Sequence, residues 1–175
     1  MRLLITAALA LTACSDAGGP PPEPGEGPAP AQASAAGEPM STGLMGGISD
    51  GAAGDVSLLH IERERLAFAN PDEAPTLSAS TTFLGVVDSE SAIAQGGASF
   101  SATAQRPPGL RVELRRIAGA APEGLCWGDR PASYVALAHD TPLTAVTLLA
   151  FSGADAPGPA AQDSTFCAIY TYAVD

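Results

Sequence analysis

The sequence predicts an all-β fold, a small antiparallel β-sandwich or barrel closed by one disulfide, with room for one short helix. Three observations support this prediction. Roughly seven or eight short segments rich in β-branched, aromatic and alternating apolar residues are separated by glycine, proline and aspartate turns. Two cysteines lie late in the chain, beside these segments. The segments together span about 125 residues, which is enough to bury an adequate core.

The first of these segments, residues 56–69, fits two structures. Leu58 and Ile61 have the spacing of a helix face, whereas Leu59 and Ile61 have the spacing of a strand face. The second arrangement is a hairpin that turns at residues 62–65. We expect the hairpin, because the segments that follow are strand-like.

Three further strand-like segments come next. Residues 76–87 are rich in Thr, Leu, Phe and Val, and residues 98–105 alternate apolar and polar side chains. Residues 110–115 alternate most regularly, with one apolar and one charged face. The charged face consists of Arg111, Glu113 and Arg115. We expect this face to pair across strands or to meet water.

The last part of the chain predicts three more strands, at residues 133–139, 143–152 and 165–174. The middle one is apolar on both faces, which is typical of a central strand. A loop rich in Gly, Pro and Ala separates it from the last strand. These strands complete the predicted antiparallel sheet.

The N-terminus has the pattern of a secretory signal, because Met1-Arg2 is followed by a short apolar run, two small residues and Cys14. The stretch Leu11-Thr12-Ala13-Cys14 resembles the lipobox of bacterial lipoproteins. The resemblance covers the first 14 residues and implies cleavage after Ala13 and lipidation of Cys14. The alternatives are an ordinary signal peptide or a transmembrane anchor. The apolar run is too short for a span, which needs about 20 residues.

The resemblance also implies a location. An aspartate directly after the lipidated cysteine resembles an inner-membrane retention signal, but Ser15 stands there and Asp16 follows one position later. We therefore expect a lipid-anchored protein of the cell envelope, at the outer membrane and facing the periplasm. Three acyl chains on one residue would make a firm anchor.

Three parts of the chain are expected: a signal peptide at residues 1–13, a lipidated cysteine with a tether at residues 14–49, and a β-rich globular domain at residues 50–175. The tether is acidic and rich in Pro, Gly and Ala, a composition that buries little and disfavours helix and inner strand. A proline-rich chain extends by up to about 3.1 Å per residue. Such a tether would hold the domain several nanometres from the membrane.

Once Cys14 is assigned to lipid, Cys126 and Cys167 remain. In an oxidising compartment we expect them to form a disulfide. It would pin the loop before residues 133–139 to the last strand. The alternative is a pair of thiols that serve as metal ligands or as a nucleophile.

The formal net charge is −11, and all 8 basic residues are arginine. Nucleic-acid binding is not expected, because phosphate contacts need a basic face. A cationic envelope protein would be attracted instead. The absence of lysine excludes a P-loop and Schiff-base chemistry, and we expect no cofactor.

No catalytic or metal-binding pattern stands out in the sequence. The chain has 2 histidines, His60 and His139, and lacks Gly-x-Ser-x-Gly, His-x-His and His-Glu-x-x-His. His139 precedes Asp140, but adjacent side chains on a strand point to opposite faces. We therefore assign no catalytic and no metal-binding residue.

The most distinctive stretch, residues 125–131, carries the one tryptophan of the chain, Trp127, beside Cys126. One hypothesis is a binding loop with Trp127, Asp129 and Arg130, since Trp and Arg dominate binding hot spots. The alternative is a structural loop in which Trp127 covers the edge of the core and Asp129 pairs with Arg130. Both hypotheses stay open at this point.

These observations favour an envelope lipoprotein that presents a small non-enzymatic binding or structural β domain in the periplasm. An alternative is an inhibitor of a cationic hydrolase such as lysozyme. The overall architecture is similar to that of bacterial lysozyme-inhibitor lipoproteins, and an acidic domain suits a basic enzyme. A third hypothesis is a small hydrolase, because the sequence does not reveal carboxylates that meet only in the fold.

Overall fold

The computed structural model describes residues 37–49, 52, 56–70 and 77–174; the expected signal peptide, Cys14 and the expected tether up to residue 36 lie outside the described residues. Within them, no helix has the length and apolar character needed to cross a membrane. The elements are β1 Leu44–Gly47, β2 Leu58–Glu62, β3 Arg65–Ala69, β4 Leu77–Asp88, α1 Phe100–Thr103, β5 Arg111–Ala118, β6 Tyr134–His139, β7 Ala145–Ser152 and β8 Thr165–Val174.

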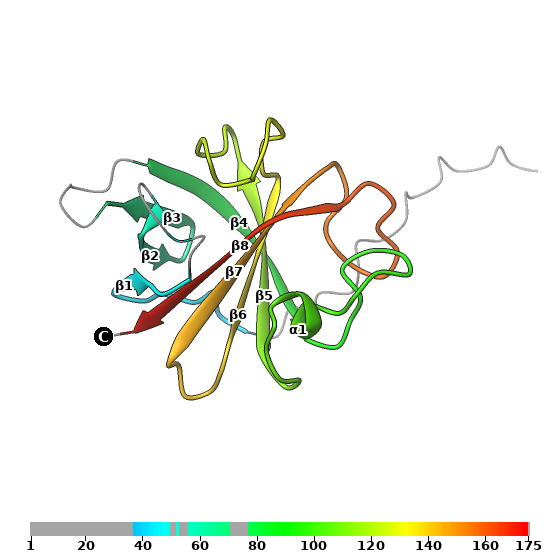
Figure 1. Ribbon diagram of the computed structural model, residues 1–175, viewed down its shortest axis with the longest axis horizontal. Helices are drawn as coiled ribbons and strands as arrows, with labels where there is room; N and C mark the ends of the chain where they lie inside the picture. The colour runs from blue at the N-terminus through cyan, green and yellow to red at the C-terminus, as the bar shows by residue number, and fades with distance from the viewer. Residues whose placement is uncertain (1–36, 50–51, 53–55, 71–76, 175) are drawn as a thin grey trace, which may run out of the picture.

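Each strand pairs antiparallel with the next strand in the chain, and β8 pairs with β1. The sheet therefore closes into an up-and-down barrel (Figure 1). Closure pairs both edge strands, which an open sheet would leave exposed. The predicted all-β fold is confirmed, with a barrel rather than a sandwich. The hairpin is confirmed as well, since β2 and β3 pair from Leu58↔Ala69 to Glu62↔Arg65.

A first core fills the barrel with apolar side chains from all eight strands. Tyr170 and Tyr172 of β8 are among its largest fully buried side chains. The hydroxyl of Tyr172 donates a hydrogen bond to the carbonyl oxygen of Val56 at 2.9 Å. Leu125, from the connection between β5 and β6, belongs to the same core and has 0% exposure. Strands and connections thus share one packed interior.

A second core lies outside the barrel, between the outer faces of β4 to β8 and the connection at residues 89–110. Residues 98–105 were expected to form a strand, but the structure corrects this, because α1 lies here. Ser99 caps α1 by accepting a hydrogen bond from the backbone N–H of Ala102 at 3.2 Å. Phe100 and Ala104 have helical spacing and are both buried, so this periodicity prevails over the strand alternation.

Two members of the charged face of β5, Glu113 and Arg115, point into the barrel and pair with each other along the strand, which corrects the expectation that this face pairs across strands or meets water. Glu113 and Arg115 stand opposite Leu137 and Val135 of β6, which belong to the barrel core, and both charged residues have 0% exposure. The apolar face of β5 packs into the second core instead. The reversal is physically possible because the connection at residues 89–110 covers the apolar face, while the buried charges are paired and hydrogen-bonded.

Residues 38–42, here called the strap, lie against the open end of the barrel before β1 begins. Met40 packs on the barrel core, and the backbone N–H of Thr42 donates to the carbonyl oxygen of Ile61 at 2.8 Å. The strap and β1 both precede residue 50, at which the globular domain was expected to begin. The folded domain therefore starts about a dozen residues earlier, because Met40 and Met45 supply apolar surface that the barrel buries.

The connections divide between two ends of the barrel. The strap end carries the turn between β2 and β3, the connection with α1, and the turn between β6 and β7. The opposite end, here called the Trp127 end, carries the β5–β6 and β7–β8 connections. In Figure 1 the β5–β6 connection projects at the top, and the β6–β7 turn lies at the bottom. The chain thus enters the barrel at one end and presents Trp127 at the other.

Candidate functional site

The connection between β5 and β6, residues 119–133, forms the Trp127 loop. Three contacts hold it against the barrel. Cys126 is bonded to Cys167 of β8, as predicted, so these sulfurs are not free thiols. Leu125 inserts into the barrel core. The hydroxyl of Tyr170 donates to the carbonyl oxygens of Gly124 at 2.8 Å and Leu125 at 3.2 Å.

Trp127 sits on this fixed loop and yet is 58% exposed. Its backbone N–H donates to the carbonyl oxygen of Cys167 at 3.3 Å. Its ring meets the ring of Tyr170 edge-on, with centroids 6.4 Å apart. Burial raises the pKa of the Tyr170 hydroxyl, and the hydrogen bond with the Trp127 side chain partly offsets this effect. An exposed aromatic ring on a fixed backbone is the type of anchor found at protein interfaces, because little conformational entropy is lost on binding.

A hollow of about 350 Å³ lies within the same loop. Glu123, Asp129 and Arg130 line it and are exposed. The ion pairs of the described residues do not include one between Asp129 and Arg130. The predicted pair of Asp129 and Arg130 is therefore not among these ion pairs, whereas Trp127 touches Tyr170 of the barrel core and keeps more than half of its surface exposed.

The connection between β7 and β8 carries two further acidic residues; it joins its strands at the Trp127 end, but its tip packs against residues 93–95, where the backbone N–H of Gly158 donates to the carbonyl oxygen of Ile93 at 2.9 Å. The backbone N–H groups of Gln162 and Asp163 each donate to the carboxylate of Asp155 at 2.9 Å. These hydrogen bonds, first that of Asp163, lower the pKa of Asp155, so it stays charged near neutral pH. Asp163 in turn accepts from the backbone N–H of Ala154 at 3.0 Å. Together the β5–β6 and β7–β8 connections contain four carboxylates and one guanidinium, that of Arg130.

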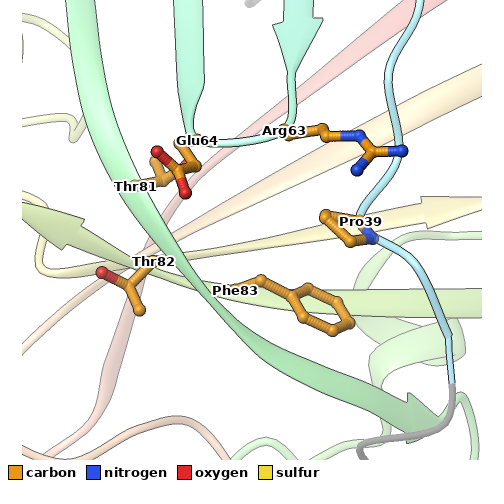
Figure 2. Close-up of a pocket in the computed structure, with 6 residues that line it drawn as sticks. All are labelled: Pro39, Arg63, Glu64, Thr81, Thr82 and Phe83. Carbon is orange, nitrogen blue, oxygen red and sulfur yellow. The ribbon is translucent and has the colours of Figure 1, made fainter.

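A second hollow, of about 450 Å³, opens at the strap end (Figure 2). Pro39 of the strap forms one side, and the ring of Phe83 points toward it from β4. Arg63 extends over the opening and lies 3.5 Å from the carboxylate of Glu38. The remaining lining residues are Glu64, Thr81 and Thr82. This hollow could not be predicted from local sequence patterns, because it forms only where the strap crosses the barrel.

The two histidines lie apart from these hollows. Nδ1 of His139 is 3.0 Å from the carbonyl oxygen of Asp140, whose carboxylate is ion-paired with Arg106. Nδ1 of His60 is 3.6 Å from the carboxylate of Glu62, two residues further along β2. Among the residues the structure describes, no group of three His, Cys, Asp or Glu side chains is placed to hold a metal ion.

Sequence reasoning missed one internal site, the pair of Glu113 and Arg115 that holds the strap. The only signal was their spacing, since charges two residues apart on a strand share one face. That spacing does not reveal which face is buried. Trp127, Asp129 and Arg130, by contrast, lie together in one loop, as expected.

No protein-family model, no curated protein and no solved structure matches this chain.

Proposed function

We propose that this chain is an envelope lipoprotein that presents a non-enzymatic protein-binding barrel, with the Trp127 loop as its binding surface. One observation carries the proposal: Trp127 is 58% exposed although the disulfide and Tyr170 hold its loop in place. Exposing a large aromatic side chain costs hydrophobic free energy, so a fixed and exposed tryptophan favours a contact with a partner.

The position of the loop agrees with a membrane tether. The lipobox-like stretch ends at Cys14, and the chain reaches the barrel at the strap end. Trp127 lies at the opposite end, beyond the full length of β5. A domain suspended in this way would present the Trp127 loop on the side away from its anchor, where a periplasmic partner has access.

The charge of the Trp127 end favours a cationic partner. The β5–β6 and β7–β8 connections contain four carboxylates and one arginine, in a chain of net charge −11. Opposite charge raises the association rate and selects among partners more than it raises affinity. A basic hydrolase such as lysozyme is one partner of this kind. Unaltered lysozyme kinetics in the presence of excess chain would remove that candidate.

The test is a pull-down from an envelope extract with residues 15–175 as oxidised bait, at low and at high salt. Trp127→Ala removes the proposed anchor, and Leu44→Ala is the matched control, because Leu44 is 53% exposed on β1, which lies outside the Trp127 loop. We expect a protein that Leu44→Ala captures and Trp127→Ala does not, with weaker capture at high salt. Equal capture by both variants would overturn the proposal. Turnover of an ester, peptide or glycan by the purified chain, abolished by a point mutation, would replace it with the hydrolase hypothesis.

A further inference from the structure

Both polar groups of the Met40 peptide backbone bind charged side chains inside the barrel. The backbone N–H of Met40 donates to Oε2 of Glu113 at 2.7 Å. Its carbonyl oxygen accepts from Nη2 of Arg115 at 2.8 Å. Glu113 and Arg115 are ion-paired with each other and have 0% exposure. One residue of the strap is thus held from both sides by a buried pair of opposite charges.

The rest of the buried pair is already satisfied by the barrel. Arg115 donates from Nε to Glu113, and from Nη1 to the carbonyl oxygen of Glu62 at 2.6 Å and to Oγ1 of Thr81 at 3.4 Å. Only Oε2 of Glu113 and the outer edge of Arg115 turn to the strap. Without Met40 these two groups would lose their partners, and buried charges without partners are strongly unfavourable.

Further contacts fix the strap on either side of Met40. Nη2 of Arg111 donates to the carbonyl oxygen of Glu38 at 3.2 Å, and the backbone of Thr42 pairs with that of Ile61. Gly37 has φ of +150° and passes so close to Arg111 that a side chain there would collide with the guanidinium. The positive φ, which L side chains rarely adopt, favours a glycine at the point where the chain reaches the barrel.

We infer that residues 38–42 act as a latch: the Glu113–Arg115 pair binds the backbone of the strap and fixes the tether to the end of the barrel opposite Trp127. The latch is inferred from these contacts alone. Its role in directing the Trp127 loop away from the membrane rests on the proposed function. The contacts that hold the strap to the barrel begin at Glu38. A force applied to the tether would therefore act on β5, through the hydrogen bonds of Met40 with Glu113 and Arg115.

Native-state hydrogen exchange on residues 15–175, followed amide by amide with NMR, tests the latch without changing the protein. We expect the Met40 amide to be protected to within about tenfold of the Ile61 amide, because both belong to one cooperative unit. Exchange of Met40 at the rate of an open chain would overturn the inference.

Two variants separate the latch from a general effect on stability. Glu113→Gln keeps the shape of the side chain but removes its charge, and should lower protection of Met40 at least tenfold more than protection of Leu148, which lies in the barrel core. Arg116→Gln changes an exposed charge on the same strand and should leave both amides unchanged. An equal loss at Met40 and Leu148 in Glu113→Gln would overturn the latch. The pull-down with Trp127→Ala is independent of this result, so the two proposals can fail separately.

Discussion

Glu113 and Arg115 form an ion pair in the interior of the barrel, where neither side chain has any exposed surface. Removing one partner of a buried pair leaves an uncompensated charge, which typically lowers the free energy of unfolding by about 3–5 kcal/mol. We expect Arg115→Met to have an effect of this size, measured by urea denaturation of residues 15–175.

The control for this prediction is Arg116→Met, one residue further along β5, where the side chain is exposed. A surface change of this kind should alter the free energy of unfolding by no more than about 0.5 kcal/mol. The double variant Glu113→Leu/Arg115→Met should lose less than the sum of the two single variants, because it leaves no unpaired charge. Equal destabilisation by Arg115→Met and Arg116→Met would contradict the role of the buried pair.

Shortening the chain should have little effect up to the strap and a large effect beyond it. A chain that begins at Gly37 keeps the contacts of Met40 with Glu113 and Arg115, whereas a chain that begins at Gly43 loses them. Hydrogen bonds to charged groups contribute about 1.5–3 kcal/mol each. We expect thermal unfolding of the first chain to match that of residues 15–175, and the second to be less stable by at least about 2 kcal/mol. A second chain that is as stable as the first would show that the strap adds nothing to the fold.

Much of the barrel could be predicted from the sequence, because alternation and turn residues are local signals. The hairpin of β2 and β3 and the strands β6 to β8 follow from such signals, whereas the link between Cys126 and Cys167 follows from the number of cysteines left once Cys14 is assigned to lipid. Residues 98–105 were assigned to a strand because alternation of small residues resembles a strand, whereas the cap at Ser99 favours a helix. Short alanine-rich segments carry both periodicities, and here tertiary packing decides.

Which face of β5 points into the barrel could not be predicted from the residues of β5 alone. Alternation separates Arg111, Glu113 and Arg115 from Val112 and Leu114, but it does not state which set faces the core. The connection at residues 89–110 covers the apolar set from outside, and the strap supplies backbone partners to the charged set inside. The strap is far from β5 in the sequence, with Met40 and Glu113 73 residues apart, and the connection directly before β5 covers its apolar set only because it folds back over the outer face of the barrel, so the tertiary structure is needed to reveal both partners.

The disulfide should contribute strongly to stability. Cys126 and Cys167 are separated by 41 residues, and closing a loop of this length stabilises a fold by about 4 kcal/mol in the chain-entropy model. We expect Cys126→Ala/Cys167→Ala to lower the free energy of unfolding by about this amount, measured by urea denaturation. The parent protein is the matched control, and it is measured once with the disulfide intact and once after a reductant has broken it. A reduced protein as stable as the oxidised one would mean that the unfolded chain is already compact.

Stability should fall at alkaline pH because of two tyrosines on β8. Burial is the main cause that raises the pKa of both Tyr170 and Tyr172. The folded state therefore holds these protons more tightly than the unfolded state, and the stabilisation is complete below the unfolded pKa of about 10. It is lost as the pH rises above that value.

Urea denaturation at about pH 8 and about pH 11 measures this loss. Tyr172→Phe removes one of the two groups and the hydrogen bond to Val56, so this variant should be less stable at the lower pH but lose less on going to the higher pH. An equal loss in parent and variant would show that Tyr172 does not contribute to the alkaline transition.

Leu125 and Trp127 lie two residues apart in one loop. We expect replacement by alanine to lower the free energy of unfolding strongly at Leu125 and only slightly at Trp127. Leu125 has 0% exposure inside the barrel core, so Leu125→Ala leaves a cavity and should cost about 2–5 kcal/mol of unfolding free energy. Trp127 is 58% exposed and contacts Tyr170 only edge-on, so Trp127→Ala should cost about 1 kcal/mol or less. Urea denaturation measures both changes. A large loss of stability in Trp127→Ala would assign the tryptophan to the fold rather than to a partner, because a residue kept for binding is one whose removal leaves the barrel intact.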